Sequence, residues 1–317
     1  MSPRIPCLVL AIIGFVSFGC GQSPPAALAP AVHLPERAPG LYIERMASGV
    51  LNRSYVLHVP RAYDATKPLA LVILLHGLAG SAAAIEASTG MPGLAEREGF
   101  VLVTPEGTGD QPLHGWNADF FNMTGADTND VGFIDSLIDK VEGEVGIDPD
   151  RVFVAGHSNG AFLAHLLGAR LSKKIAAIAA VAGTIGIPQR DGGMKQIPRP
   201  GEPVSVLIVH GKVDPMVQYD SHARALLHDI GALDSGRFWA RCDGCTMTPV
   251  ETASPNHNVI TDTFSGGKNR TEVTVVSIVN GVHDWPGGMG RHGVETSTGV
   301  NATDLIWQFF KTHPKQH

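Results

Sequence analysis

Five apolar runs without a charged residue constrain the fold of this 317-residue chain more than any other feature. A strand that is buried on both faces reads as such a run, because neither face carries polar side chains. Helical patterns lie between several of the runs, and this alternation predicts a mostly parallel α/β sheet with helices on both faces. The runs are LALVILL (69–75), VFVAG (152–156), IAAIAAVAG (175–183), VSVLIVHG (204–211) and VTVVSIVNG (273–281).

The segments between the runs complete this expectation. Residues 41–60 alternate like two strands of a hairpin, and residues 81–99 read as a helix with breaks at its glycines. Residues 130–146 and 301–313 show helical patterns, the first with apolar side chains on one face. Only about twenty residues, rich in Pro and Gly, lie between 182 and 203. This segment is too short for a large lid domain.

The N-terminus reads as a targeting segment. Arg4 precedes the apolar stretch 7–18, which is too short to span a bilayer and ends in small residues. We therefore predict a signal peptide over 1–19, a Pro/Ala-rich tether over 20–40 and a single α/β domain over 41–317. The net charge of −6 and the lack of a basic run argue against a nucleic-acid partner.

Cys20 follows Ser17, Phe18 and Gly19 in a stretch that resembles a bacterial lipobox. We expect Cys20 to be the lipidated first residue of an exported, periplasmic or extracellular protein. Ser17 and Phe18 depart from the usual pattern, so secretion after ordinary cleavage stays open. No later apolar run is long enough for a membrane span, so any membrane attachment is expected at this end.

Cys242 and Cys245 are the two cysteines that lie outside the N-terminal segment. A zinc ribbon needs a second cysteine pair, which the chain lacks, so we expect no metal there. In an exported protein the favoured interpretation is a local disulfide between them, and two free thiols are the alternative.

Ser158 stands between Gly156 and Gly160, where a strand pattern changes into a helix pattern. A G-x-S-x-G turn in this context is a nucleophile elbow, which exposes the serine hydroxyl on a sharp corner. The alternative is a turn that simply needs small residues. His157 lies beside the serine, and we expect it to be a wall or packing residue.

Asp214 and His283 also follow buried strands, and both lie downstream of Ser158. A serine hydroxyl needs a base to take its proton, and that base needs an acid to orient it. Loops after parallel strands meet at one edge of the sheet, so we predict a Ser158–His283–Asp214 triad. An Asp before a proline is also a common turn residue, and a lone His means little. We select these two residues because each follows a buried strand downstream of Ser158.

The serine–acid–histidine order is that of the α/β-hydrolase fold. In that pattern the oxyanion hole uses two backbone N–H groups. One belongs to the residue after the nucleophile, here Asn159, and the other to the loop after the third strand, here Leu78. We expect no metal and no cofactor.

Seven short motifs carry a resemblance to a known family. They are LLHG (74–77), GWN (115–117), DVGF (130–133), GHSNGA (156–161), HGKVD (210–214), WARCDGC (239–245) and HDWPGG (283–288). With them the chain resembles the polyhydroxybutyrate-depolymerase-like and feruloyl-esterase-like group of α/β-hydrolases. In the group's usual Gly-His-Thr-Trp-Pro-Gly run, Val282 and Asp284 here replace the Gly and the Thr, which bears on substrate fit. The resemblance implies esterase activity on short hydroxyacyl or aromatic acyl esters, with Trp116 and Trp285 in the acyl pocket. Plain core packing is the alternative for Trp116.

The leading interpretation is a carboxylic ester hydrolase of the polyhydroxybutyrate-depolymerase type, acting on a small-molecule or oligomeric ester. A feruloyl or acetylxylan esterase is the alternative, and a peptidase on the same fold comes after it. A non-catalytic surface-binding protein on a hydrolase scaffold would predict a damaged triad, whereas all three residues are present. Aromatic residues around 108–129 and at Trp285, with no lid domain, predict short acyl groups.

Overall fold

The computed structural model describes Met1 and residues 37–125, 127–188, 193–221, 230–289 and 299–317. The predicted signal peptide, the lipidation residue Cys20 and most of the tether lie outside the described residues. One compact unit spans Leu34–His317. No helix in the described segments has both the length and the apolar character needed to cross a bilayer.

The centre of this unit is a ten-stranded sheet with the order β1-β2-β4-β3-β5-β6-β9-β12-β11-β10. The six strands from β4 to β12 in this order run parallel, while both ends of the sheet are antiparallel. The strands are β1 (Gly40–Ser48), β2 (Leu51–Val59), β3 (Leu69–Leu75), β4 (Val101–Pro105), β5 (Ile147–His157), β6 (Ala177–Val181), β9 (Ser205–Gly211), β10 (Val250–Ala253), β11 (Val259–Phe264) and β12 (Val273–Ile278). A separate small hairpin pairs β7 (Gly186–Pro188) with β8 (Met194–Gln196).

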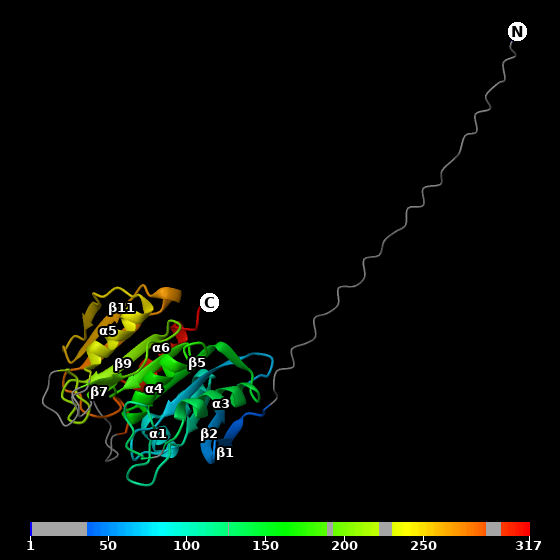
Figure 1. Cartoon of the computed structure of the whole chain (residues 1–317), viewed down its shortest axis with the longest axis horizontal. Coiled ribbons are helices and arrows are strands. Elements are labelled where there is room, and N and C mark those ends of the chain that lie inside the picture. The colour runs from blue at the N-terminus through cyan, green and yellow to red at the C-terminus, as the bar shows by residue number, and fades with distance from the viewer. Residues whose placement is uncertain (2–36, 126, 189–192, 222–229, 290–298) are drawn as a thin grey trace. The chain divides into compact units, whose positions relative to one another are not determined.

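Helices cover both faces of the sheet (Figure 1). The apolar side chains of α3, α4 and α5 join the core on one face, and those of α1, α2 and α6 join the core on the other. The α-helices are α1 (Ala82–Thr89), α2 (Met91–Glu98), α3 (Asp130–Glu142), α4 (Asn159–Arg170), α5 (Ala232–Asp243) and α6 (Ala302–Thr312), and a 3₁₀ turn η1 covers Lys268–Arg270. This arrangement confirms the predicted fold class.

Local sequence signals explain several boundaries. Gly90 adopts a left-handed conformation with φ of 66° and separates α1 from α2, as the expected break predicts. The Asn129 side chain accepts the Gly132 N–H and caps α3, and the Asn301 side chain caps α6 by accepting the Asp304 N–H. The predicted hairpin is β1–β2.

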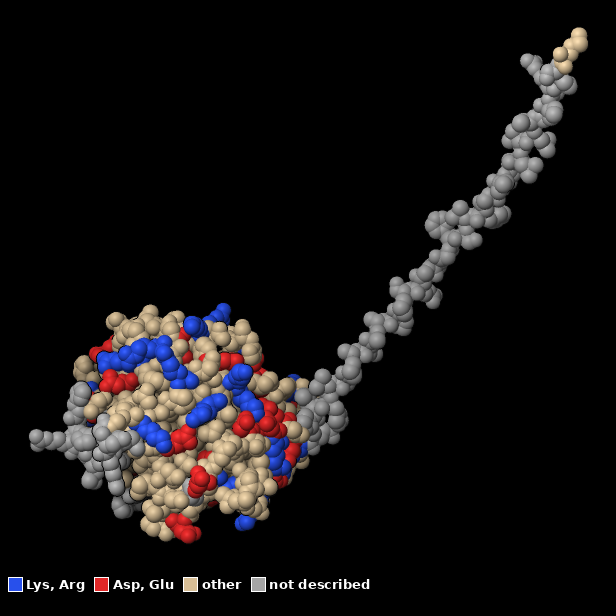
Figure 2. All heavy atoms as spheres, in the orientation of Figure 1, with Lys and Arg blue, Asp and Glu red and all other residues tan. Residues whose placement is uncertain are grey.

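The surface in view carries both signs of charge without a large patch of either. Figure 2 shows basic and acidic side chains intermixed on this face. The described surface also holds ion pairs, such as Lys174 with Asp135 at 2.6 Å and Arg170 with Asp119 at 3.1 Å.

Candidate active site

Ser158, Asp214 and His283 come together at the carboxyl ends of three parallel strands. They follow β5, β9 and β12, which lie within four neighbouring strands of the sheet. His283 Nδ1 lies 2.8 Å from Asp214 Oδ2, and His283 Nε2 lies 2.9 Å from Ser158 Oγ. Because a carboxylate only accepts, the proton sits on Nδ1, which leaves Nε2 to accept the Ser158 hydroxyl proton.

Ser158 occupies a sharp turn between β5 and α4 with a positive φ. Ser158 has φ of 53° and ψ of −118°, between the last strand residue and the first turn of α4. The flanking glycines make room for this turn. A Cβ on Gly156 would lie 2.3 Å from the Gly160 carbonyl oxygen, and one on Gly160 would lie 2.4 Å from the Leu75 carbonyl oxygen. The two glycines are therefore required by close backbone approach.

The Asp214 carboxylate is excluded from solvent, and both of its oxygens accept hydrogen bonds. Its Oδ1 accepts the N–H groups of Met216 and Val217 at 2.8 and 2.9 Å, while Oδ2 faces His283. Burial works to raise the pKa of Asp214, but the hydrogen bond from His283, the electrostatic influence of His283 and His210 and the hydrogen bond from the Val217 N–H outweigh it and lower that pKa. The carboxylate is thus held ionised, in the form that can orient and stabilise a protonated His283.

Leu78 and Asn159 line the same cavity as Ser158. Within the described segments, neither of their backbone N–H groups donates to another residue. The loop after β3 is tightened by two neighbouring bonds, from the Gly80 N–H to the Gly77 carbonyl at 3.0 Å and from the Ala79 N–H to the His114 carbonyl at 2.7 Å. Two unengaged amides beside a nucleophile are the arrangement that an oxyanion hole needs.

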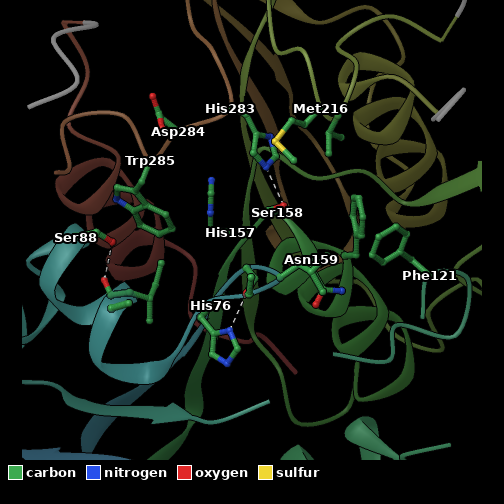
Figure 3. Close-up of a pocket in the computed structure, with 18 of the residues that line it drawn as sticks. His76, Ser88, Phe121, His157, Ser158, Asn159, Met216, His283, Asp284 and Trp285 are labelled. Carbon is green, nitrogen blue, oxygen red and sulfur yellow. Dashed lines mark hydrogen bonds between the residues drawn. The ribbon is translucent and has the colours of Figure 1, made fainter. Parts of the chain in front are cut away.

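A cavity of about 630 Å³ opens above Ser158. Figure 3 shows Ser158 between two walls, with Trp285 and Ser88 on one side and Met216 and Phe121 on the other. Met216 and Met289 are half exposed and stand in the lining of this cavity. The cavity therefore has an apolar mouth over a polar floor.

The structure corrects one predicted pocket residue and places the other. Trp116 is fully buried and does not line the cavity, so its expected place in the acyl pocket is wrong. Its indole N–H donates to the His76 carbonyl at 2.8 Å, which turns the ring into the core. Trp285 does line the cavity, and its indole N–H is anchored on Thr303 Oγ1 at 2.9 Å. Of the two phenylalanines that follow Trp116, Phe121 lines the cavity and Phe120 is buried.

The predicted disulfide is also corrected, because Cys242 and Cys245 are both free thiols. Cys242 lies in the last turn of α5, and Cys245 follows the left-handed C-cap Gly244. The Cys245 thiol is directed to the Thr271 carbonyl, with 3.8 Å between Sγ and the oxygen, and is nearly buried. Burial raises the pKa of Cys245 to about 11. The segment therefore packs as a helix end, with one thiol turned into the core.

His76, Glu106 and His114 bring potential ligand atoms within 4.8 Å of one another. The donor set does not suit a metal ion, because His76 Nε2 already accepts the Gly107 N–H at 3.0 Å. The two imidazole rings are also nearly parallel, with 8° between their planes, so their lone pairs do not converge on one point. Burial lowers the pKa of His76 to about 4, and its other nitrogen is held by the Gly77 carbonyl at 2.8 Å. His76 thus serves as a neutral structural link.

Sequence reasoning missed several residues of the site. Met216 and Val217 line the cavity two and three residues after Asp214, and that spacing within one turn was the available signal. Ile85 and Ser88 reach the cavity from α1, and Phe162 reaches it from α4. Their sequence patterns indicate only which face of the helix is apolar, and an apolar face can pack in the core or line a cavity.

Comparison with known proteins shows that the chain is similar to esterases. Residues 53–190 match the family model described as "Esterase PHB depolymerase". The chain is 28% identical to a putative esterase, NocK, of Nocardia uniformis subsp. tsuyamanensis, over 80% of this chain and 79% of that protein. It is 26% identical to a probable feruloyl esterase C of Aspergillus terreus, over 84% of this chain and 87% of that protein.

Solved structures include similar folds. An acetyl xylan esterase from Aspergillus awamori superposes with a TM-score of 0.56 at 14% identity, covering 85% of this chain and 99% of that one. At this identity the likeness concerns the fold alone. The assignment of esterase activity rests on the matched family model and on the similar esterases. The chain is therefore a carboxylic ester hydrolase with the α/β-hydrolase fold, and it resembles the polyhydroxybutyrate-depolymerase-like and feruloyl-esterase-like group of that superfamily.

Proposed function

We propose that the enzyme cleaves esters through a Ser158–His283–Asp214 triad and a covalent acyl-enzyme. The observation that carries this proposal is the unbroken chain of two contacts, 2.9 Å from Ser158 Oγ to His283 Nε2 and 2.8 Å from His283 Nδ1 to Asp214 Oδ2. In this arrangement Nε2 takes the hydroxyl proton as Oγ attacks the ester carbonyl. Asp214 remains ionised and stabilises the imidazolium that forms.

The oxygen of the tetrahedral intermediate then carries a negative charge, and the N–H groups of Leu78 and Asn159 are proposed to receive it. His283 next gives its proton to the leaving alcohol, which departs as the carbon–oxygen bond breaks. Water repeats the sequence on the acyl-enzyme, with His283 as base and then as acid, and releases the carboxylic acid and free Ser158. Atoms and protons balance without a cofactor.

Replacement of Ser158 tests the mechanism. Ser158→Ala should lower kcat by about a million-fold and leave substrate binding in place, because only the nucleophile is lost. Ser136→Ala is a matched control, since Ser136 is exposed on α3 and its hydroxyl bonds the Gly132 carbonyl of its own helix. Substantial ester turnover by purified Ser158→Ala would refute the assignment.

For the substrate, we propose a short hydroxyacyl ester of the polyhydroxybutyrate kind, including the ends of oligomers. The half-exposed Met216 and Met289 at the cavity mouth support a partner with an apolar body. A feruloyl or acetylxylan ester is the second candidate, favoured by the aromatic wall of Phe121 and Phe162, whose rings lie 5.0 Å apart. The deciding experiment compares kcat/KM on hydroxybutyrate oligomers, ethyl ferulate, acetylated xylan and a peptide amide. Preference for the amide would overturn both ester assignments.

We further propose that the protein is exported, with Cys20 as a lipidated N-terminus and the Pro/Ala-rich segment as a spacer. The sequence of residues 1–20 supports this. Mass spectrometry of the mature N-terminal peptide decides it. A diacylglyceryl-modified Cys20 is expected, and an unmodified peptide that starts beyond Cys20 would show a soluble secreted form instead.

A further inference from the structure

The side chain of Asn159, the residue after the nucleophile, is paired with the backbone of Trp116. Asn159 Oδ1 accepts the Trp116 N–H at 2.7 Å, and Asn159 Nδ2 donates to the Trp116 carbonyl at 3.0 Å. Both residues are buried. A side-chain amide that satisfies both backbone groups of one distant residue fixes the two segments relative to each other, because breaking either bond leaves a buried polar group unpaired.

Trp116 passes this constraint on to the loop that carries Leu78. The Trp116 indole N–H donates to the His76 carbonyl at 2.8 Å, and the two rings pack with 4.9 Å between their centroids. His76 is tied in turn to the Gly77 carbonyl and the Gly107 N–H. A continuous set of buried bonds therefore runs from Asn159 through Trp116 to the residue two positions before Leu78.

We propose that the Asn159 side chain is a clamp that sets the distance between the two oxyanion donors, its own N–H and that of Leu78. The inference rests on the proposed function, in which those two amides receive the developing charge. Each donor must lie within about 2.7–3.1 Å of the oxyanion, and a misplacement of about 1 Å can cost about 100-fold in rate. Asn159 thus has two roles, as a donor through its backbone and as a positioning residue through its side chain.

A substitution at Gly115 tests the clamp independently, because Gly115 lies against the side chains of both Asn159 and Leu78. A Cβ at Gly115 would come 2.5 Å from Asn159 Oδ1 and 3.1 Å from Leu78 Cδ1. Gly115→Ala therefore displaces the clamp without removing any of its polar groups. Gly93 in α2 is the matched control, since a Cβ there has no heavy atom within 4 Å. Gly93→Ala should leave catalysis unchanged.

The experiment measures kcat and KM of Asn159→Ala, Gly115→Ala and Gly93→Ala on an oxygen ester and on its thiono analogue. Asn159→Ala keeps the backbone N–H but loses the clamp. We expect kcat on the oxygen ester to fall about 10- to 100-fold in both clamp variants, with KM within about threefold. Sulfur is a weak hydrogen-bond acceptor, so the thiono ester gains little from the donors and should lose less. The oxygen-to-thiono preference should therefore shrink in both variants.

A purely structural role predicts another result. If Asn159→Ala and Gly115→Ala melt earlier but keep kcat within about threefold and an unchanged oxygen-to-thiono preference, the clamp proposal is wrong. Trp116→Phe covers the case that these two variants do not fold, because it keeps a core aromatic, although a smaller one, and removes the indole N–H that reaches His76. It should show the same loss of preference in a smaller degree, and an unchanged preference would also overturn the proposal.

Failure of the clamp and failure of the proposed mechanism give different results. Substantial turnover by Ser158→Ala would refute the nucleophile and the oxyanion geometry built on it. An inactive Ser158→Ala together with an unaffected Asn159→Ala and Gly115→Ala would refute the clamp alone.

Discussion

His210 Nε2 lies 3.6 Å from Asp214 Oδ2, and both side chains are completely excluded from solvent. His210 does not hydrogen bond this oxygen, because its Nε2 is 2.8 Å from the Val217 carbonyl and donates there. Burial lowers the pKa of His210, so the ring is neutral. His210 therefore holds the turn 214–217 in place, while His283 donates a side-chain hydrogen bond to Asp214.

This division predicts a specific defect for Asp214→Asn. The amide can present an N–H to His283 Nδ1, which then keeps its lone pair there and places its proton on Nε2, the nitrogen that must accept from Ser158. We expect kcat to fall by about 10⁴, while the melting temperature changes little. Asp304→Asn, a change at an exposed carboxylate, is the control. A fall of less than about tenfold would show that Asp214 does not orient the base.

Asp243 predicts a pH-dependent stability. Burial raises the pKa of its carboxyl from 3.8 to about 7. Below about pH 4 the group is protonated in both folded and unfolded chains. Between the two values the unfolded chain releases the proton first, so rising pH removes stability, by about 1.4 kcal/mol per pH unit at most.

The variant Asp243→Asn isolates this effect. Its free energy of unfolding relative to the wild type should increase as pH rises from 4 to 7 and then level off. Urea unfolding of the wild type and the variant at several pH values measures this difference. A difference that stays flat across the range would mean that Asp243 titrates normally.

The cavity predicts a cut-off in acyl length. Phe121, Phe162 and Met216 close one wall and Trp285 closes the other, so kcat/KM should fall steeply beyond about six acyl carbons. Phe121→Ala should move the cut-off to longer chains, whereas Met247→Ala, at an exposed position outside the cavity, should not. Nitrophenyl esters of rising chain length give the profile. A rate that climbs steadily to long chains would indicate a lipase instead.

The two thiols predict slow labelling. Burial raises the pKa values of Cys242 and Cys245, so little thiolate is present near neutral pH. Alkylation of the folded, unreduced protein at pH 7.5 should be slow, and after denaturation both residues should react fully. Peptide mass spectrometry that covers 242–245 measures this. A peptide that stays unlabelled until a reductant is added would restore the disulfide.

The sequence was sufficient to predict the buried parallel strands and the meeting of Ser158, Asp214 and His283 at one edge of the sheet. A doubly buried strand leaves an unmistakable apolar run, and the turn after such a strand has one possible location at the sheet edge. Trp116 shows where this reasoning ends. Its place next to a site motif is visible in the sequence, but the side to which its ring turns depends on the His76 carbonyl, 40 residues away along the chain. The hydrogen bonds between Asn159 and Trp116 could not be predicted for the same reason. The helix α5 was also not anticipated, although residues 232–243 fold as one.

The backbone at Ser158 has a consequence for how this protein would change if activity no longer mattered. Its φ of 53° is one that side chains with a Cβ avoid, at a cost of about 1–3 kcal/mol. Glycine adopts it freely and loses only about 0.5–1 kcal/mol to the greater freedom of the unfolded chain. Ser158→Gly should therefore melt a few degrees above the wild type while being inert. In a population selected for thermal endurance alone, this position would be among the first to change, and the proposed nucleophile would disappear before the fold did.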